Sequence, residues 1–137
     1  MTEYEIVNQF NSFLISNAIY LAVFTFLLWM AFRGTIRLYE NGGTILNKVL
    51  SSLFSLCVVY FNLQTLGFLY ANWQGTAYNL SQLDNLSPAA QSFVDFVDGG
   101  SLDGFSLIPA DPVAMVFFAV VLISLLVPTW MAPAPKE

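Results

Sequence analysis

Three long stretches of this sequence contain no charged side chain, and each is long enough to cross a lipid bilayer. They run from Phe13 to Phe32, from Val49 to Asn72 and from Pro112 to Trp130. A helix rises about 1.5 Å per residue, so roughly 20 residues cover the ~30 Å hydrocarbon core of a bilayer. Inside that core the backbone has to satisfy its own hydrogen bonds, and a helix does so within one segment. The sequence therefore predicts an all-α integral membrane protein with three transmembrane helices.

The charge content supports a membrane environment. Only 9% of the residues are charged and 57% are hydrophobic, whereas a typical soluble domain has about 25% charged residues. Much of the surface must therefore face lipid or other protein. The formal net charge of −5 also argues against nucleic acid as a partner, because nucleic-acid binding relies on basic surface that neutralises phosphates. We expect other integral membrane subunits and membrane lipids as partners instead.

The chain is interpreted as a single membrane domain over residues 1–137 that is divided into six segments. An amphipathic lead-in at the membrane interface precedes the first span, and a short extramembrane helix lies between the second and third spans. The predicted segments are the lead-in 1–12, span one with a cytoplasmic extension 13–40, span two 44–72, an outer acidic segment 73–111 with a helix 88–98, span three 112–132 and a disordered tail 133–137.

Local capping patterns indicate where these helices begin and end. Thr2 followed by Glu5 is typical of a capping box. Ser87-Pro88 and Asp111-Pro112 each place a capping side chain before a proline at the first helical position. Asn41-Gly42-Gly43 is typical of a helix end followed by a turn. Spans one and two are therefore predicted to form an antiparallel hairpin around that turn.

The basic residues predict an orientation in the membrane. Arg33, Arg37 and Lys48 lie in the loop between spans one and two, whereas the segment 73–111 has no basic residue. Lys and Arg in short loops favour the cytoplasmic side. We therefore expect a bacterial inner membrane protein with its N-terminus outside and with the loop 33–48 and the C-terminus in the cytoplasm. Arg33, Arg37 and Lys48 are predicted to anchor the helices at anionic headgroups.

Span two carries a polar face. Ser51, Ser55, Asn62 and Thr65 follow one another at spacings of four, seven and three residues, which places them on one side of a helix. A polar group in hydrocarbon is costly unless it is hydrogen-bonded, so this face is predicted to make polar contacts with another helix. Thr25 of span one lies at the depth of Asn62 and is predicted to contact it. A ligand, quinone or ion site on this face is the alternative.

Small residues four apart predict where two helices pack closely, because they let the backbones approach each other. Such pairs are Ala18 with Ala22 in span one, and Ser51 with Ser55 and Gly67 with Ala71 in span two. Gly67 is the most informative position, since a glycine inside a span has little other reason to be there.

The sequence predicts no catalytic, cofactor-binding or metal-ligating residue. It contains no histidine and one cysteine, so the commonest metal ligand and the usual general base near neutral pH are missing. No motif is specific enough to indicate a family.

Three functions from different classes remain open at this point. The first is a small non-catalytic accessory subunit that stabilises or shields a larger membrane complex of respiratory, photosynthetic or membrane monooxygenase type. The second is a self-assembling small transporter or channel lined by the polar face of span two. The third is an enzyme or redox carrier, for which the sequence supplies no intramembrane carboxylate, cysteine pair or histidine.

Overall fold

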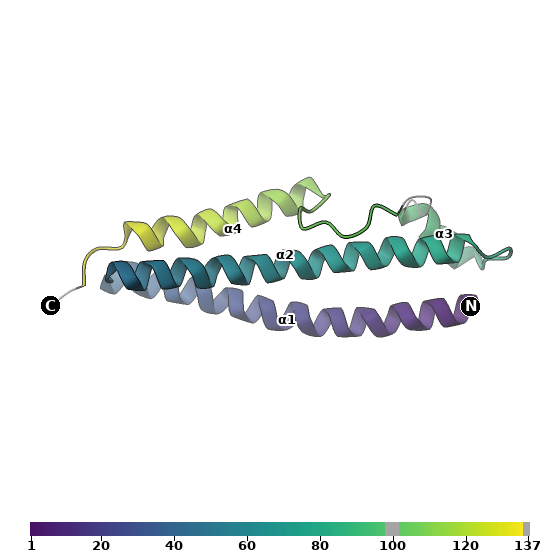
Figure 1. Ribbon diagram of the computed structural model, residues 1–137, viewed down its shortest axis with the longest axis horizontal. Coiled ribbons are helices and arrows are strands. Elements are labelled where there is room, and N and C mark those ends of the chain that lie inside the picture. Colours follow the sequence, from purple (N-terminus) through teal and green to yellow (C-terminus); the bar gives the residue numbers. More distant parts are fainter. Residues whose placement is uncertain (98–101, 136–137) are drawn as a thin grey trace. The chain divides into compact units, whose positions relative to one another are not determined.

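The chain is helical in a computed structural model that describes residues 1–97 and 102–135. Its elements in order are α1 (Glu3–Asn41), α2 (Ile45–Ser81), α3 (Pro88–Val97) and α4 (Pro112–Met131) (Figure 1). No strand occurs among the described residues. By length and composition, α1, α2 and α4 are each able to cross a membrane. The prediction of an all-α chain is confirmed for the described residues, and the three long apolar helices suit a helical membrane protein.

The first two long helices extend beyond the predicted spans. The predicted lead-in 1–12 runs into span one without a break, because α1 is continuous over 39 residues from Glu3. Span two was predicted to end at residue 72, yet α2 continues to Ser81 and has 37 residues. At about 1.5 Å per residue both helices exceed 50 Å, well beyond a ~30 Å hydrocarbon core. An isolated glycine such as Gly75 weakens a helix by only about 1 kcal/mol, so nothing in this region ends it earlier.

The shorter helices lie close to their predicted positions. Helix α3 begins at Pro88 and ends at Val97, and the predicted last residue, Asp98, lies outside the described residues. Helix α4 begins at Pro112 and ends one residue before the predicted 132. It contains Pro128, which has no N–H to donate to the preceding turn.

The predicted capping side chains are in place. The backbone N–H of Thr2 donates to Glu5 Oε2 at 2.8 Å, and the N–H of Glu5 donates to Thr2 Oγ1 at 3.3 Å. Asp111 accepts a backbone N–H from the first turn of α4 at 3.0 Å. Gly42 has a φ of 76°, the left-handed conformation that ends many helices. These caps satisfy backbone groups that a helix end leaves without partners.

The chain divides into two compact units. The first comprises Met1–Tyr20 and Gln64–Leu107, and the second comprises Leu21–Leu63 and Ile108–Glu137. The first unit thus contains the start of α1, the end of α2 and all of α3. Its buried core consists of Ile6, Ala77, Leu80, Ala90 and Val94.

The second unit packs α4 against the later part of α1 and the early part of α2. Its buried core consists of Ala31, Val59, Val121 and Leu125. In Figure 1, α4 runs beside the early part of α2, and the indole N–H of Trp130 donates to Ser52 Oγ at 3.1 Å across this contact.

Two threonines add a buried polar contact between α1 and α4. The hydroxyls of Thr35 and Thr129 are 3.3 Å apart, and both side chains are at most 2% exposed. Thr129 also donates to the carbonyl of Leu125 at 2.8 Å. Hydroxyl pairs of this kind join helices in an apolar surrounding, where little else distinguishes a neighbouring helix from lipid.

The end of α4 and the first tail residues are held against the turn between α1 and α2. The N–H of Gly43 donates to the carbonyl of Pro133 at 3.0 Å. Lys48 Nζ donates to the carbonyls of Trp130 and Ala132, which the end of α4 leaves without helical partners. We call these contacts the tail clasp. Pro133 and Ala134 of the predicted tail therefore lie beside the hairpin turn.

Candidate functional site

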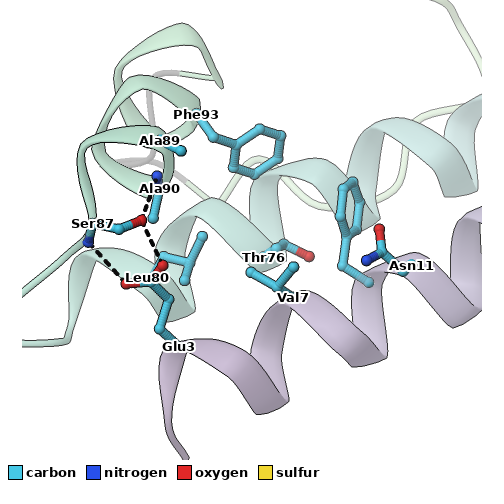
Figure 2. Close-up of a pocket in the computed structure, with 10 residues that line it drawn as sticks. Glu3, Val7, Asn11, Thr76, Leu80, Ser87, Ala89, Ala90 and Phe93 are labelled. Carbon is cyan, nitrogen blue, oxygen red and sulfur yellow. Dashed lines mark hydrogen bonds between the residues drawn. The ribbon is translucent and has the colours of Figure 1, made fainter.

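A cavity of the first unit lies between α1, α2 and α3 (Figure 2). It has a volume of about 330 Å³. Its walls are mostly apolar, with Val7 from α1, Leu80 from α2 and Phe93 from α3, whereas Glu3 and Ser87 lie at one end. A cavity of this kind suits an apolar side chain or small apolar molecule with one polar contact.

Glu3 and Ser87 are joined by two hydrogen bonds between α1 and the start of α3. Ser87 Oγ donates to Glu3 Oε1 at 2.6 Å, and the backbone N–H of Ser87 donates to Glu3 Oε2 at 2.9 Å. Ser87 Oγ also accepts the N–H of Ala90 at 3.2 Å, as an N-cap does. In a capping box, the side chain of the third helical residue accepts the backbone N–H of the N-cap residue. Here the third residue is Ala90, and Glu3 supplies the carboxylate from another helix.

These hydrogen bonds favour the ionised form of Glu3. The Ser87 hydroxyl and then the Ser87 backbone N–H lower the pKa of the Glu3 carboxyl below its ordinary value of 4.5. Glu3 also lies in the first turn of α1 and beside the first turn of α3, and a helix N-terminus attracts negative charge. Glu3 is therefore a hydrogen-bond acceptor that fixes the position of α3, and it is poorly suited to act as a general acid.

The lowered pKa of Glu3 predicts a pH dependence for the docking of α3. A carboxyl group whose pKa is lower in the folded than in the unfolded protein stabilises the fold at any pH above its unfolded-state pKa. This stabilisation is lost as the pH falls through the folded-state pKa. We therefore expect α3 to loosen as the pH falls below about 4.5. Amide hydrogen exchange of residues 88–97, corrected for the intrinsic rate at each pH, would measure this loosening.

Two variants separate Glu3 from the other carboxylates. Glu3→Gln places an amide N–H against two donors and should reduce the protection of α3 already at pH 7. Glu5→Gln makes the same change of charge at an exposed residue that caps α1 itself, and it should retain the pH dependence. Equal behaviour of the two variants would contradict the assignment to Glu3.

The first unit exposes large apolar side chains outside the predicted spans. Phe96 is 76% exposed, Leu102 57% and Phe105 47%. Phe96 contacts the ring of Trp73 and Phe105 contacts the ring of Phe68, with centroids 6.3 and 4.8 Å apart. We call Phe96, Leu102 and Phe105 the outer apolar residues. Their exposed surface is available for lipid or for another protein.

The structure places the predicted polar face of α2 mostly in the interior. Ser55, Asn62 and Thr65 are buried, whereas Ser51 is half-buried. Asn62 Nδ2 donates to the carbonyl of Phe24 at 3.2 Å and to that of Val58 at 2.9 Å. The amide thus reaches α1 at the predicted depth.

Two further residues differ from the predicted polar contacts. The partner of Asn62 on α1 is the backbone at Phe24, and the side chain of Thr25 is exposed instead. Ser52, which the pattern did not include, is buried and bonded to Trp130. The hydroxyl of Ser55 is fully buried and has no hydrogen-bond partner among the described residues.

The predicted small-residue pairs have different environments. Ala18 and Ala22 are exposed, so this face of α1 does not pack against the described part of the chain. Gly67 is buried, and Ala71 is half-buried. A Cβ at Gly67 would lie 2.4 Å from the carbonyl oxygen of Ser106. The close approach at Gly67 is therefore made by the segment after α3, which periodicity alone does not reveal.

The three predicted headgroup anchors also differ from one another. Arg33 lies over the ring of Trp29 at 5.8 Å from its centroid, within the range of a cation–π interaction. Arg37 is exposed and lines a second cavity beside the hairpin turn. Lys48 belongs to the tail clasp. The three basic residues, which the sequence analysis treated alike, thus have three different surroundings.

Glu3 was difficult to select as a site residue from the sequence alone. The available signal was indirect: Ser87 starts a helix that has alanine at its third position, so the N-cap N–H lacks a local carboxylate. Among the described residues, no three His, Cys, Asp or Glu side chains are placed to hold a metal ion. The arrangement around Glu3 is suited to holding helices together and to binding.

No protein-family model, curated protein or solved structure matches the chain.

Proposed function

We propose that the chain is a non-catalytic accessory subunit of a larger integral membrane complex. The outer apolar residues carry this proposal. They are large and exposed, and they lie in the segment between α2 and α4, outside the predicted spans. Exposed apolar surface outside hydrocarbon is a common mark of a protein contact. The subunit would place this segment on the outer side and the hairpin turn in the cytoplasm.

The environment of the α2 polar face favours this proposal over a pore. A channel needs its polar groups to face water, whereas Ser55 and Asn62 are 0% and 5% exposed. Asn62 also directs its amide at two backbone carbonyls. Side chains in such surroundings serve packing within the chain, as expected of a subunit that stabilises a complex.

Mild extraction from native membranes tests the proposal. We expect the 15.2 kDa chain to co-purify with at least one different membrane protein. Phe96→Ser combined with Leu102→Ser should weaken that association by at least about 100-fold, because burying each side chain contributes about 1.5–3 kcal/mol. Mass spectrometry of the co-purified proteins measures the loss.

A matched control replaces an exposed apolar residue within a membrane-length helix. Ile123→Ser in α4 removes a side chain that is 61% exposed, and it should retain the partner. The proposal fails if the wild-type chain runs as a monomer or only with copies of itself. It also fails if the double variant keeps its partner as firmly as Ile123→Ser does.

A further inference from the structure

A second cavity, of about 500 Å³, lies between α1 and α2 beside the hairpin turn in the second unit. One end of it is polar and is lined by Arg37 of α1 and by Asn47 and Ser51 of α2. The rest is apolar and includes Met30 and Phe54. We call it the basic groove. Its lining changes from charged to apolar along the helices.

Among the described residues, no acidic side chain lines the groove. Glu40 is the acidic residue closest to Arg37 in sequence, and it lines a separate cavity against α4. Within the described residues, the Arg37 guanidinium forms no ion pair. Exposed arginine with free donors favours a carboxylate or phosphate partner, which its planar group can bind through two hydrogen bonds.

The start of α2 adds to the same positive potential. Asn47 lies in the first turn of α2, where the backbone N–H groups are not used within the helix. Thr44 Oγ1 accepts the N–H of Asn47 at 3.2 Å and the carbonyl of Thr44 accepts that of Lys48 at 3.1 Å, so Ile45 and Leu46 are the residues of this turn whose N–H groups have no helical acceptor. A helix N-terminus beside a guanidinium is a favourable place for an anion.

The groove crosses the predicted boundary between the headgroup region and the hydrocarbon. Arg37 follows the apolar stretch that ends at Phe32 by five residues, which is about 7–8 Å in a helix. Met30 and Phe54 lie inside the apolar stretches. The charged end of the groove thus lies where headgroups begin, and the apolar end lies where acyl chains begin.

Gly34 leaves the middle of the groove open. A Cβ built at Gly34 meets no heavy atom within 4 Å, and Gly34 lines the groove between Arg37 and Met30. A larger residue at this position would occupy the space between the charged and apolar ends. The absence of a side chain there keeps the two ends connected.

We propose that the basic groove binds a phospholipid with an anionic headgroup. The headgroup phosphate contacts Arg37, with Asn47 and Ser51 as further donors. One acyl chain passes Gly34 and lies against Met30 and Phe54. This inference does not depend on the proposed accessory role, because the groove belongs to the second unit and the outer apolar residues belong to the first.

The test is a titration of the purified full chain in neutral detergent with phosphatidylglycerol, followed by native mass spectrometry. Arg37→Gln should weaken binding at least tenfold. The matched control is Arg33→Gln, which changes the net charge equally one turn away, at a residue that contacts Trp29 and does not line the groove. We expect less than a threefold effect from it. Equal losses in the two variants would overturn the proposal, since they would indicate a general attraction between basic residues and anionic lipid.

A second variant tests the apolar part of the groove without changing the charge. Gly34→Leu should reduce phosphatidylglycerol binding at least tenfold, while unfolding in detergent occurs at the same or a higher temperature because leucine favours the helix. Binding of phosphatidylcholine with equal affinity would overturn the preference for an anionic headgroup. Competition by inorganic phosphate as effective as that by the lipid would overturn the lipid as the occupant. Unchanged lipid binding by Gly34→Leu would overturn the assigned acyl path.

Discussion

Replacing Gly42 by valine is expected to destabilise the second unit by about 2–4 kcal/mol. Gly42 has a φ of 76°, which a β-branched residue adopts only with strain. A Cβ at this position would also lie 2.2 Å from the carbonyl oxygen of Ala134 and 2.9 Å from that of Pro133. Both are backbone atoms, so no side-chain rotation relieves the overlap. The tail must move away, and the hydrogen bond between Gly43 and Pro133 is lost with it.

Thermal unfolding in detergent measures the loss of stability, and limited proteolysis near residue 134 reports the release of the tail. Gly34→Ala is the matched control in the same unit, because a Cβ there has open space. Alanine in a helix interior is favoured over glycine by about 1 kcal/mol, so this variant should be unchanged or more stable. A similar loss in both variants would show that the tail clasp is not the cause.

Replacing Asn62 by aspartate is expected to cost about 2–4 kcal/mol at pH 7. The Asn62 amide donates to the carbonyls of Phe24 and Val58, and the side chain is 5% exposed. A carboxylate of the same shape would present two acceptors to two acceptors in an apolar surrounding. The expected result is a lower unfolding temperature with α1 and α2 separated around this position.

The control for this change is Asn79→Asp in the same helix. Asn79 is exposed and lies in the part of α2 beyond the predicted span, so its replacement should alter stability by less than about 0.5 kcal/mol. The comparison also bears on function. If Asn62 lined a water-filled pore, the new carboxylate would be hydrated and both variants would be tolerated. Equal stability of the two would therefore favour the channel and count against the packing role.

Features of the fold that depend on residues close together in the sequence were predictable. The apolar stretches indicated the three long helices, and Thr2, Ser87 and Asp111 indicated helix starts because a cap and its partner are only two or three residues apart. The end of span two was predicted at residue 72 because Trp73 and Tyr70 resemble the interfacial aromatics that mark the end of a span, whereas the helix α2 itself continues nine residues further to Ser81.

Contacts between distant segments were harder to predict for a physical reason. Asn62 was expected to bond Thr25, and its partner is the backbone carbonyl of Phe24. Every residue has such a carbonyl, so no letter in the sequence distinguishes this one. Glu3 and Lys48 were likewise counted as charges, yet each satisfies the backbone at the end of another helix. Only the three-dimensional arrangement identifies such partners.

The hydrogen bonds between Glu3 and Ser87 have a consequence for biosynthesis. They connect residues 84 positions apart, and the Thr35–Thr129 contact connects residues 94 apart. A ribosome therefore completes both of the first two spans before either contact is possible. Loop closure over such separations costs only a little more than over short ones, but it delays folding. The start of α1 is made first and reaches its final surroundings only after α3 has been synthesised, so a nascent chain that pauses before Ser87 would leave its own N-terminal turn undocked.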